Sequence, residues 1–82
     1  MSIEDFILLE DYRKTLIVYN GIYLTKNDDI DYVYELYSIE NFFVEVKFNR
    51  VTGKLISFLP FYDLDKLNRY LDEISLIKIF SN

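Results

Sequence analysis

The chain has 82 residues, of which 51% are hydrophobic, and a formal net charge of -5 at pH 7. It contains no Cys and no His, which excludes disulfides, thiolate metal sites and the commonest general base of enzymes. This length predicts one domain over residues 1–82, with a small core that its eight Tyr and seven Phe can fill.

A helix is predicted first, over residues 3–18. Ser2 can cap its start, and the acids Glu4 and Asp5 suit the positive end of the helix dipole. Gly21 marks its end. An apolar stripe at 3-4-3 spacing indicates the side that faces the core, formed by Leu9, Tyr12, Leu16 and Tyr19.

Four strands are predicted next. A short strand over residues 22–25 and an alternating strand over residues 31–38 come before the longest β signal of the chain, residues 42–59. That signal predicts a β-hairpin whose turn ends at Gly53, where a positive φ is needed, and whose return strand ends at Pro60. Short connections favour an antiparallel meander.

The hairpin register follows if Asn49 faces Lys54. One face of the hairpin is then predicted to be core, formed by Phe42, Val44, Val46, Phe48, Leu55 and Leu59. The other face is mixed, because Phe43, Ile56 and Phe58 fall beside charged side chains.

A second helix is predicted over residues 64–74, with Asp63 as its N-cap and a stripe of apolar side chains. Residues 75–80 are apolar and form either a fifth strand or a segment pinned across the core. The predicted fold class is therefore α+β: a four-stranded antiparallel meander with an N-terminal and a C-terminal helix packed on one face.

The charge is distributed unevenly. Residues 1–41 hold nine acids and three bases, whereas residues 42–82 hold five acids and six bases. An acidic half repels phosphates, so no nucleic acid partner is expected, and it attracts basic protein surfaces. The chain shows no signal-peptide pattern and no apolar run of ~18 residues, so a cytoplasmic protein without membrane contact is expected.

Several positions together form a pattern, LY…F-[FY]-V-E-V…F…L…YL. It is matched within residues 21–74 by Leu36-Tyr37, Phe42 to Val46, Phe61, Leu67 and Tyr70-Leu71. The chain therefore resembles small uncharacterised bacterial proteins of the toxin-immunity or accessory type. The resemblance implies a cytoplasmic partner of a toxin and supplies no catalytic residues. Where the pattern has an Arg-rich return strand, this chain has Leu55 to Phe58.

The densest acidic cluster is the predicted turn that holds Asp28, Asp29 and Asp31, with Glu35 following. A calcium loop requires D-x-D-x-D-G and a glutamate at its twelfth position, and this spacing does not match. No metal and no cofactor are therefore expected. Either a solvated turn or a contact with a basic protein explains these carboxylates.

No catalytic residue is expected either. The serines have no His or Cys beside them to act as a base. Glu45 lies two residues from Lys47 on one strand face, and a surface ion pair explains it more simply than acid–base catalysis. The sequence therefore does not predict an enzyme.

These observations predict a non-enzymatic protein-binding inhibitor, an immunity protein or antitoxin that neutralises a bacterial toxin. The expected partner-binding residues are Asp28, Asp29, Asp31, Glu35, Tyr34, Tyr37 and Phe43. A phage-encoded inhibitor of a bacterial defence system, of the anti-CRISPR kind, fits size and acidity equally well. A third hypothesis is a structural domain that forms a homodimer through a sheet face of Phe43, Ile56 and Phe58.

Overall fold

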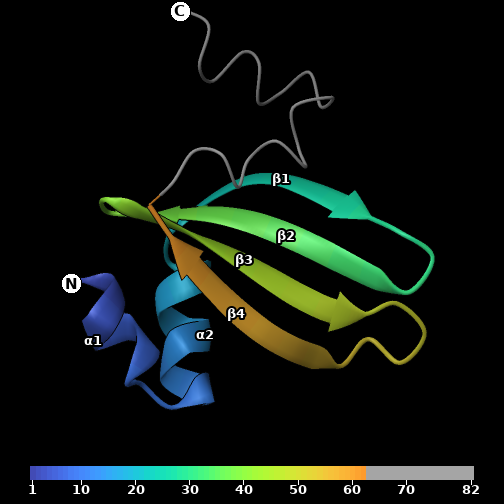
Figure 1. Cartoon of the computed structure of the whole chain (residues 1–82), viewed down its shortest axis with the longest axis horizontal. Helices are drawn as coiled ribbons and strands as arrows, with labels where there is room; N and C mark the ends of the chain where they lie inside the picture. The colour runs from blue at the N-terminus through green and yellow to red at the C-terminus, as the bar shows by residue number, and fades with distance from the viewer. Residues whose placement is uncertain (63–82) are drawn as a thin grey trace, which may run out of the picture.

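The structure is a computed structural model, and it describes residues 1–62 (Figure 1). Its elements are α1 (Ile3–Ile7), α2 (Asp11–Tyr19), β1 (Ile22–Asp28), β2 (Tyr32–Ile39), β3 (Phe42–Asn49) and β4 (Leu55–Phe61). The strands pair antiparallel in sequence order, which confirms the meander and the α+β class. The predicted helix over residues 64–74 and the tail over residues 75–80 lie outside the described residues.

The prediction of one continuous helix over residues 3–18 is wrong, because the chain forms two short helices there. Ser2 caps α1 as predicted: its Oγ accepts from the Asp5 N–H at 3.1 Å, and the Asp5 carboxylate accepts from the Ser2 N–H at 3.4 Å. A second helix starts after Glu10, whose backbone is extended. In one straight helix Phe6 and Val18 would project ~120° apart. The break lets both side chains enter one core, where both are fully buried.

The predicted core-facing stripe is also wrong, because α2 turns most of it toward solvent. Tyr12 is 58% exposed and Leu16 is 60% exposed, whereas Val18 is buried and Ile17 is partly buried. The β-branched side chains carry no polar atom and pack on the sheet, while Tyr12 keeps its hydroxyl outside. Both sides of this helix are apolar, so the spacing alone did not distinguish them.

The predicted register of the β3–β4 hairpin holds near its turn. The Asn49 N–H donates to the Lys54 carbonyl at 2.8 Å, and Phe48 pairs with Leu55. Gly53 has a φ of +72°, as predicted for the end of this turn. Leu55, however, is exposed rather than buried.

A β-bulge then shifts the register by one residue. Val46 faces Phe58 instead of the predicted Ser57. Because side chains alternate along a strand, the shift moves Phe58 into contact with Phe6, at 6.2 Å between ring centroids, and leaves Leu59 exposed on the other side.

The predicted homodimer face is therefore not a single surface. Phe58 packs beneath α1, whereas Phe43 lies on the opposite side of the sheet and stacks on Phe61 at 5.7 Å. Ile56 lies at the bulge and is exposed. The three side chains cannot meet one copy of themselves across one plane.

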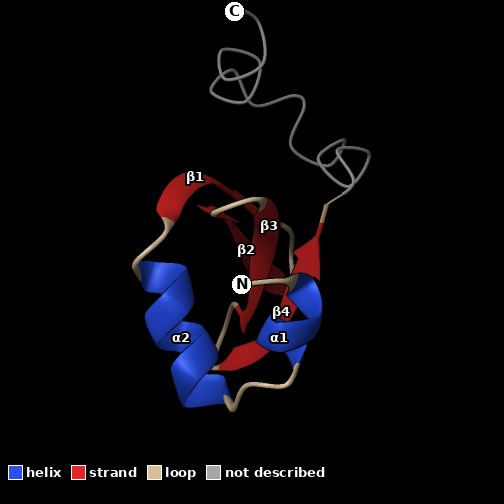
Figure 2. Cartoon of the chain, turned by 90° about the vertical axis from the view of Figure 1, so that its left-hand side faces the viewer, coloured by secondary structure: helices blue, strands red, loops and turns tan. Residues whose placement is uncertain are grey.

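The two faces of the sheet hold separate clusters. We call the face of Val44 and Val46 the helix face, because Phe6 of α1 and Val18 of α2 join its buried cluster. Figure 2 shows α1 and α2 next to each other at one end of the sheet. We call the face of Leu36 the second face. Its smaller cluster comprises Leu36, Phe61, Leu24, Tyr34 and Phe43.

Both edge strands of the sheet are irregular. The register of β1 shifts between Tyr23 and Thr25, and β4 carries the bulge just described. The strand β4 also contains Pro60, which pairs with Val44 although it has no amide donor. An edge position tolerates this, so the strand continues through Pro60 to Phe61, two residues past the predicted last residue, Leu59.

Candidate protein-binding surface

Asp29 organises the turn between β1 and β2. Its Oδ1 accepts from the backbone N–H groups of Asp31 at 2.9 Å and Tyr32 at 2.8 Å, and its Oδ2 accepts from the Tyr34 hydroxyl at 3.2 Å. These hydrogen bonds hold the pKa of the Asp29 carboxyl below its usual value, and the bond from the Tyr32 N–H has the largest effect. Asp29 is therefore a fixed part of the turn as well as a surface charge.

Arg50, from the β3–β4 loop, joins this turn to its neighbour. Its backbone N–H donates to the Asp31 carbonyl at 3.0 Å, and its Nη1 donates to the Asp29 carbonyl at 2.8 Å. The same Nη1 lies 3.4 Å from Asp28 Oδ2, an exposed ion pair of a kind that contributes only ~0–1 kcal/mol. The acidic turn thus has a cation from a distant part of the chain, which its own sequence did not reveal.

The tips of these two loops carry the most exposed large apolar side chains of residues 1–62. Ile30 is 85% exposed and Val51 is 89% exposed. The second tip is ordered by Asn49, whose Oδ1 accepts from the N–H groups of Val51 and Thr52, both at 2.9 Å. Figure 1 shows the two loops side by side, at the end of the sheet away from α1 and α2. We call these two loops, residues 28–31 and 50–54, the loop end.

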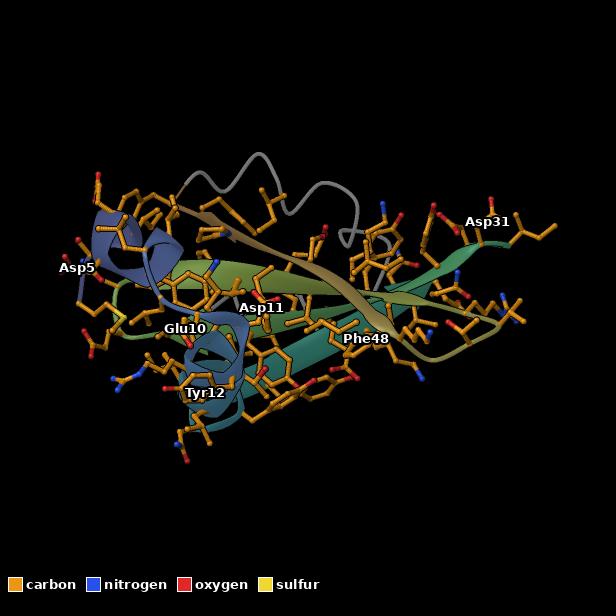
Figure 3. All side chains as sticks on the ribbon, turned by 90° about the horizontal axis from the view of Figure 1, so that it is seen from below. Asp5, Glu10, Asp11, Tyr12, Asp31 and Phe48 are labelled. Atoms are coloured by element: carbon orange, nitrogen blue, oxygen red, sulfur yellow. The ribbon has the colours of Figure 1, made fainter. Side chains whose placement is uncertain are left out.

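Sequence reasoning missed Ile30 and Val51. Each is a single apolar residue in a polar loop, so neither produces a periodic signal. The only usable hint was an isoleucine enclosed by Asp29 and Asp31, where a solvated turn needs no large apolar side chain. Asp31, on the same turn as Ile30, points outward into solvent (Figure 3).

Glu35 lies on the helix face, at the end of α2. Its Oε1 accepts from the hydroxyls of Tyr37 at 3.0 Å and Tyr19 at 3.5 Å. Burial raises the pKa of the Tyr37 hydroxyl, and the Glu35 carboxylate raises it further. The rings of Tyr37 and Tyr19 meet edge to face at 5.2 Å. Two of the predicted partner-binding residues are thus engaged in contacts between a strand and a helix.

Tyr34 and Phe43 lie on the second face. The Lys47 Nζ lies 3.9 Å from the centroid of the Tyr32 ring and 6.0 Å from that of Tyr34. Glu45, predicted as half of a surface ion pair, is buried on this face. Tyr34 and Phe43 are separated from Glu35 by the sheet, because neighbouring residues of a strand, such as 34 and 35, project to opposite faces.

The seven predicted partner-binding residues therefore occupy three places. Asp28, Asp29 and Asp31 stay together at the loop end, while the others divide between the two faces of the sheet. Only the aspartates form a continuous exposed group.

The helix end exposes apolar side chains as well, and we use this name for α1, α2 and the start of β1. Besides Tyr12 and Leu16, its exposed members are Ile7, Leu8, Tyr19, Ile22 and Tyr23. A shallow hollow of about 230 Å³ lies there, lined by Met1, Leu9, Arg13, Leu16 and Ile17. Glu10 and Asp11 lie at the start of α2 (Figure 3).

Comparison with known proteins finds no family model, no curated protein and no solved structure that matches the chain. The resemblance to toxin-immunity proteins stays a prediction. Within residues 1–62, no group of three or more acidic side chains could hold a metal ion, and neither α1 nor α2 is long and apolar enough to cross a bilayer.

Proposed function

We propose that this chain is a small non-enzymatic inhibitor that binds a protein through its loop end. The form that we favour is a cytoplasmic immunity protein or antitoxin that masks a bacterial toxin. One observation supports it above the others: Ile30 and Val51 stand exposed on neighbouring ordered loops, beside three aspartates.

The loop end has the properties of a pre-organised anchor. Asp29, Asn49 and Arg50 hold the two tips by hydrogen bonds, so little loop freedom is lost on binding. Full burial of one Val or Ile side chain contributes about 1.5–3 kcal/mol. Two such side chains that enter one apolar pocket of a partner form a hot spot of ordinary strength.

The charges around the loop tips indicate what kind of surface the partner has. The two loops hold three carboxylates, Asp28, Asp29 and Asp31, and two cations, Arg50 and Lys54. Arg50 pairs with Asp28, and Lys47 of β3 lies close enough to Asp29 to help lower its pKa. Within the two loops the carboxylates outnumber the cations, so they steer a partner whose pocket has a basic rim. A nuclease toxin fits this description, because its phosphate-binding surface is basic.

A binding role also agrees with how the carboxylates are used. Asp29 accepts three hydrogen bonds within its turn, and Glu35 accepts from two tyrosine hydroxyls. Both are engaged in holding the fold, which supports a protein that acts by contact.

The proposal is tested by capture from the native host. The tagged full chain is compared with an Ile30→Asp, Val51→Asp double variant, and the captured protein is identified and titrated against both. We expect the double variant to lose at least ~30-fold in affinity, the effect of a ~2 kcal/mol hot spot. The control is Tyr12→Asp with Leu16→Asp, two apolar positions at the helix end that are also more than half exposed. A loss in the control and none in the loop variant would contradict the proposal.

Charge reversal tests the steering separately. Asp28→Lys with Asp31→Lys keeps Asp29 and its three hydrogen bonds in the turn, although it removes the ion pair between Asp28 and Arg50. We expect slower association and a weaker dependence of the association rate on salt, with little change in the dissociation rate. Unchanged association would place the contact away from the aspartates. The captured protein itself distinguishes a toxin from a defence enzyme, the target in the phage-inhibitor hypothesis.

A further inference from the structure

Three tyrosines and one carboxylate meet where the end of α2 lies against β1 and β2. Tyr19 is the last residue of α2, Tyr23 lies on β1, and Glu35 and Tyr37 lie on β2. The Tyr37 ring is central: it meets the Tyr19 ring at 5.2 Å and 89°, and the Tyr23 ring at 5.6 Å and 70°. Tyr37 is buried, whereas Tyr19 and Tyr23 are exposed, so this group opens to solvent. We call these four side chains the tyrosine cluster.

The Glu35 carboxylate uses one of its two oxygens within residues 1–62. Its Oε1 accepts from the hydroxyls of Tyr37 and Tyr19, while no group in this part of the chain donates to Oε2. No fully buried side-chain oxygen among the same residues lacks a hydrogen-bond partner, so Oε2 must reach solvent. The joint between α2 and the sheet thus needs Oε1 alone, and Oε2 is an acceptor for a group from outside.

The charge of Glu35 is not offset by a cation of residues 1–62. Neither ion pair in this range includes Glu35. Lys26 is its neighbour in the β1–β2 register, but that side chain is exposed and lies beyond ion-pair distance. Burial raises the pKa of all three tyrosine hydroxyls of the cluster, and Glu35 raises it further, so the hydroxyls stay neutral at physiological pH. The tyrosine cluster therefore presents one negative charge framed by neutral aromatic rings.

A primary ammonium group matches these features. Aromatic rings attract a cation through their faces, and the three N–H donors of an ammonium suit Oε2 and the outer lone pairs of the hydroxyls. A guanidinium matches less well, because its bidentate contact needs both carboxylate oxygens and Oε1 is already occupied. The cluster is also open, without the enclosure in which proteins hold small ligands. A lysine side chain held in place by the rest of a protein partner therefore fits better than a free amine.

We propose that the tyrosine cluster receives a lysine side chain of a protein partner, with the ammonium at Glu35 Oε2 and the methylene groups along the rings of Tyr19 and Tyr23. The site lies on the helix face and shares no residue with the loop end. This inference therefore does not depend on the proposed function, and either one can fail while the other holds.

A titration of the full chain with Nα-acetyl-lysine N-methylamide, followed by NMR at constant ionic strength, tests the site. We expect saturable shifts of the side-chain signals of the tyrosine cluster. The arginine analogue and the trimethyllysine analogue, whose ammonium has no N–H donor, should bind more weakly. Equal or tighter binding of either analogue, or no saturable shift up to ~100 mM, overturns the proposal. Binding of cadaverine that is more than ~10-fold tighter would assign the site to a free amine and overturn it as well.

Two pairs of variants separate the site from a general effect of charge or exposure. Glu35→Gln keeps an oxygen for the two hydroxyls and should weaken binding of the lysine analogue at least ~5-fold. Its control, Glu4→Gln, removes the same charge from an exposed position of α1 and should not. Tyr23→Ser should weaken binding ~2–5-fold, whereas Tyr12→Ser, another exposed tyrosine, should not. The second pair decides the matter if Glu35→Gln fails to fold, and equal losses in a variant and its control overturn the proposal.

Discussion

The two ends of this molecule both expose apolar side chains, but they hold them differently. At the loop end, Ile30 and Val51 sit on turns fixed by Asp29, Asn49 and Arg50 through backbone hydrogen bonds. At the helix end, the exposed side chains lie on short helices that are anchored from beneath by buried side chains. Exposed apolar area alone therefore does not single out an interface; the two ends differ in what holds that area in place, hydrogen bonds within the loops at one end and buried side chains beneath helices at the other.

The largest expected effect is at the anchor of the helix end. Phe6→Ala should destabilise the protein by ~3–5 kcal/mol, because it leaves a cavity among side chains that the Phe6 ring touches at both Phe42 and Phe58. Chemical denaturation measures the loss. Leu8→Ala, which is exposed on the same helix end, should change stability by less than ~0.5 kcal/mol. Similar losses in both variants would show that α1 is not held through Phe6.

The next effect concerns the joint between α2 and the sheet. A Cβ at Gly21 would lie 2.4 Å from Ile39 Cδ1 and 2.7 Å from the Ser38 carbonyl oxygen. Gly21→Ala should therefore cost ~1–3 kcal/mol through overpacking. Gly53→Ala at the loop end meets no atom within 4 Å and should cost only ~1 kcal/mol, from its positive φ. Denaturation curves that reverse this order would contradict the close approach at Gly21.

The loop end should respond to pH through Asp29. Its pKa lies below the ordinary value of 3.8, so the ionised carboxylate stabilises the folded state at neutral pH, and this contribution disappears as the pH falls through the lowered pKa. Asp29→Asn should therefore be less stable than the natural chain at pH 7, and the difference should shrink between about pH 5 and 2.

Urea denaturation across this pH range measures the difference. Asp31→Asn, a neighbouring exposed aspartate, is the matched control. A gap between Asp29→Asn and the natural chain that stays constant with pH would mean that the charge of Asp29 does not support the turn.

The smallest expected effect on stability is at the loop tips. Ile30→Ser and Val51→Ser should change the unfolding free energy by less than ~0.5 kcal/mol, because both side chains are almost fully exposed. Thermal denaturation checks this. A large loss would show that the tips serve the fold, which would weaken their assignment to a partner.

The sequence predicted the parts of the fold that depend on local patterns. Three such features were predicted correctly: the alternation in β3, the pairing of Asn49 with Lys54 at the turn, and the positive φ of Gly53. The bulge in β4 has no local signature, so the face of Phe58 was assigned wrongly. The side of α2 was assigned wrongly because Tyr12 and Val18 compete for the core and only the packed structure decides.

The candidate site was predictable to a similar extent. The three aspartates were found together because they are neighbours in sequence. Arg50 and Val51 lie next to the aspartates only because the β1–β2 and β3–β4 hairpins are paired side by side, and residue spacing in the sequence does not predict that contact. Glu35 was separated from Tyr34 by alternation, a rule that could have been applied to the site as it was to the sheet.

The irregular edges of the sheet bear on the behaviour of the protein at high concentration. A chain with this much hydrophobic and aromatic content would form fibrous aggregates readily if either outer strand offered a long, regular row of amide and carbonyl groups. The register shift in β1, and the bulge and Pro60 in β4, shorten both rows to a few residues. Strand-to-strand growth between molecules is thereby discouraged at the two sheet edges that residues 1–62 form, which lowers the tendency of the protein to aggregate at high concentration.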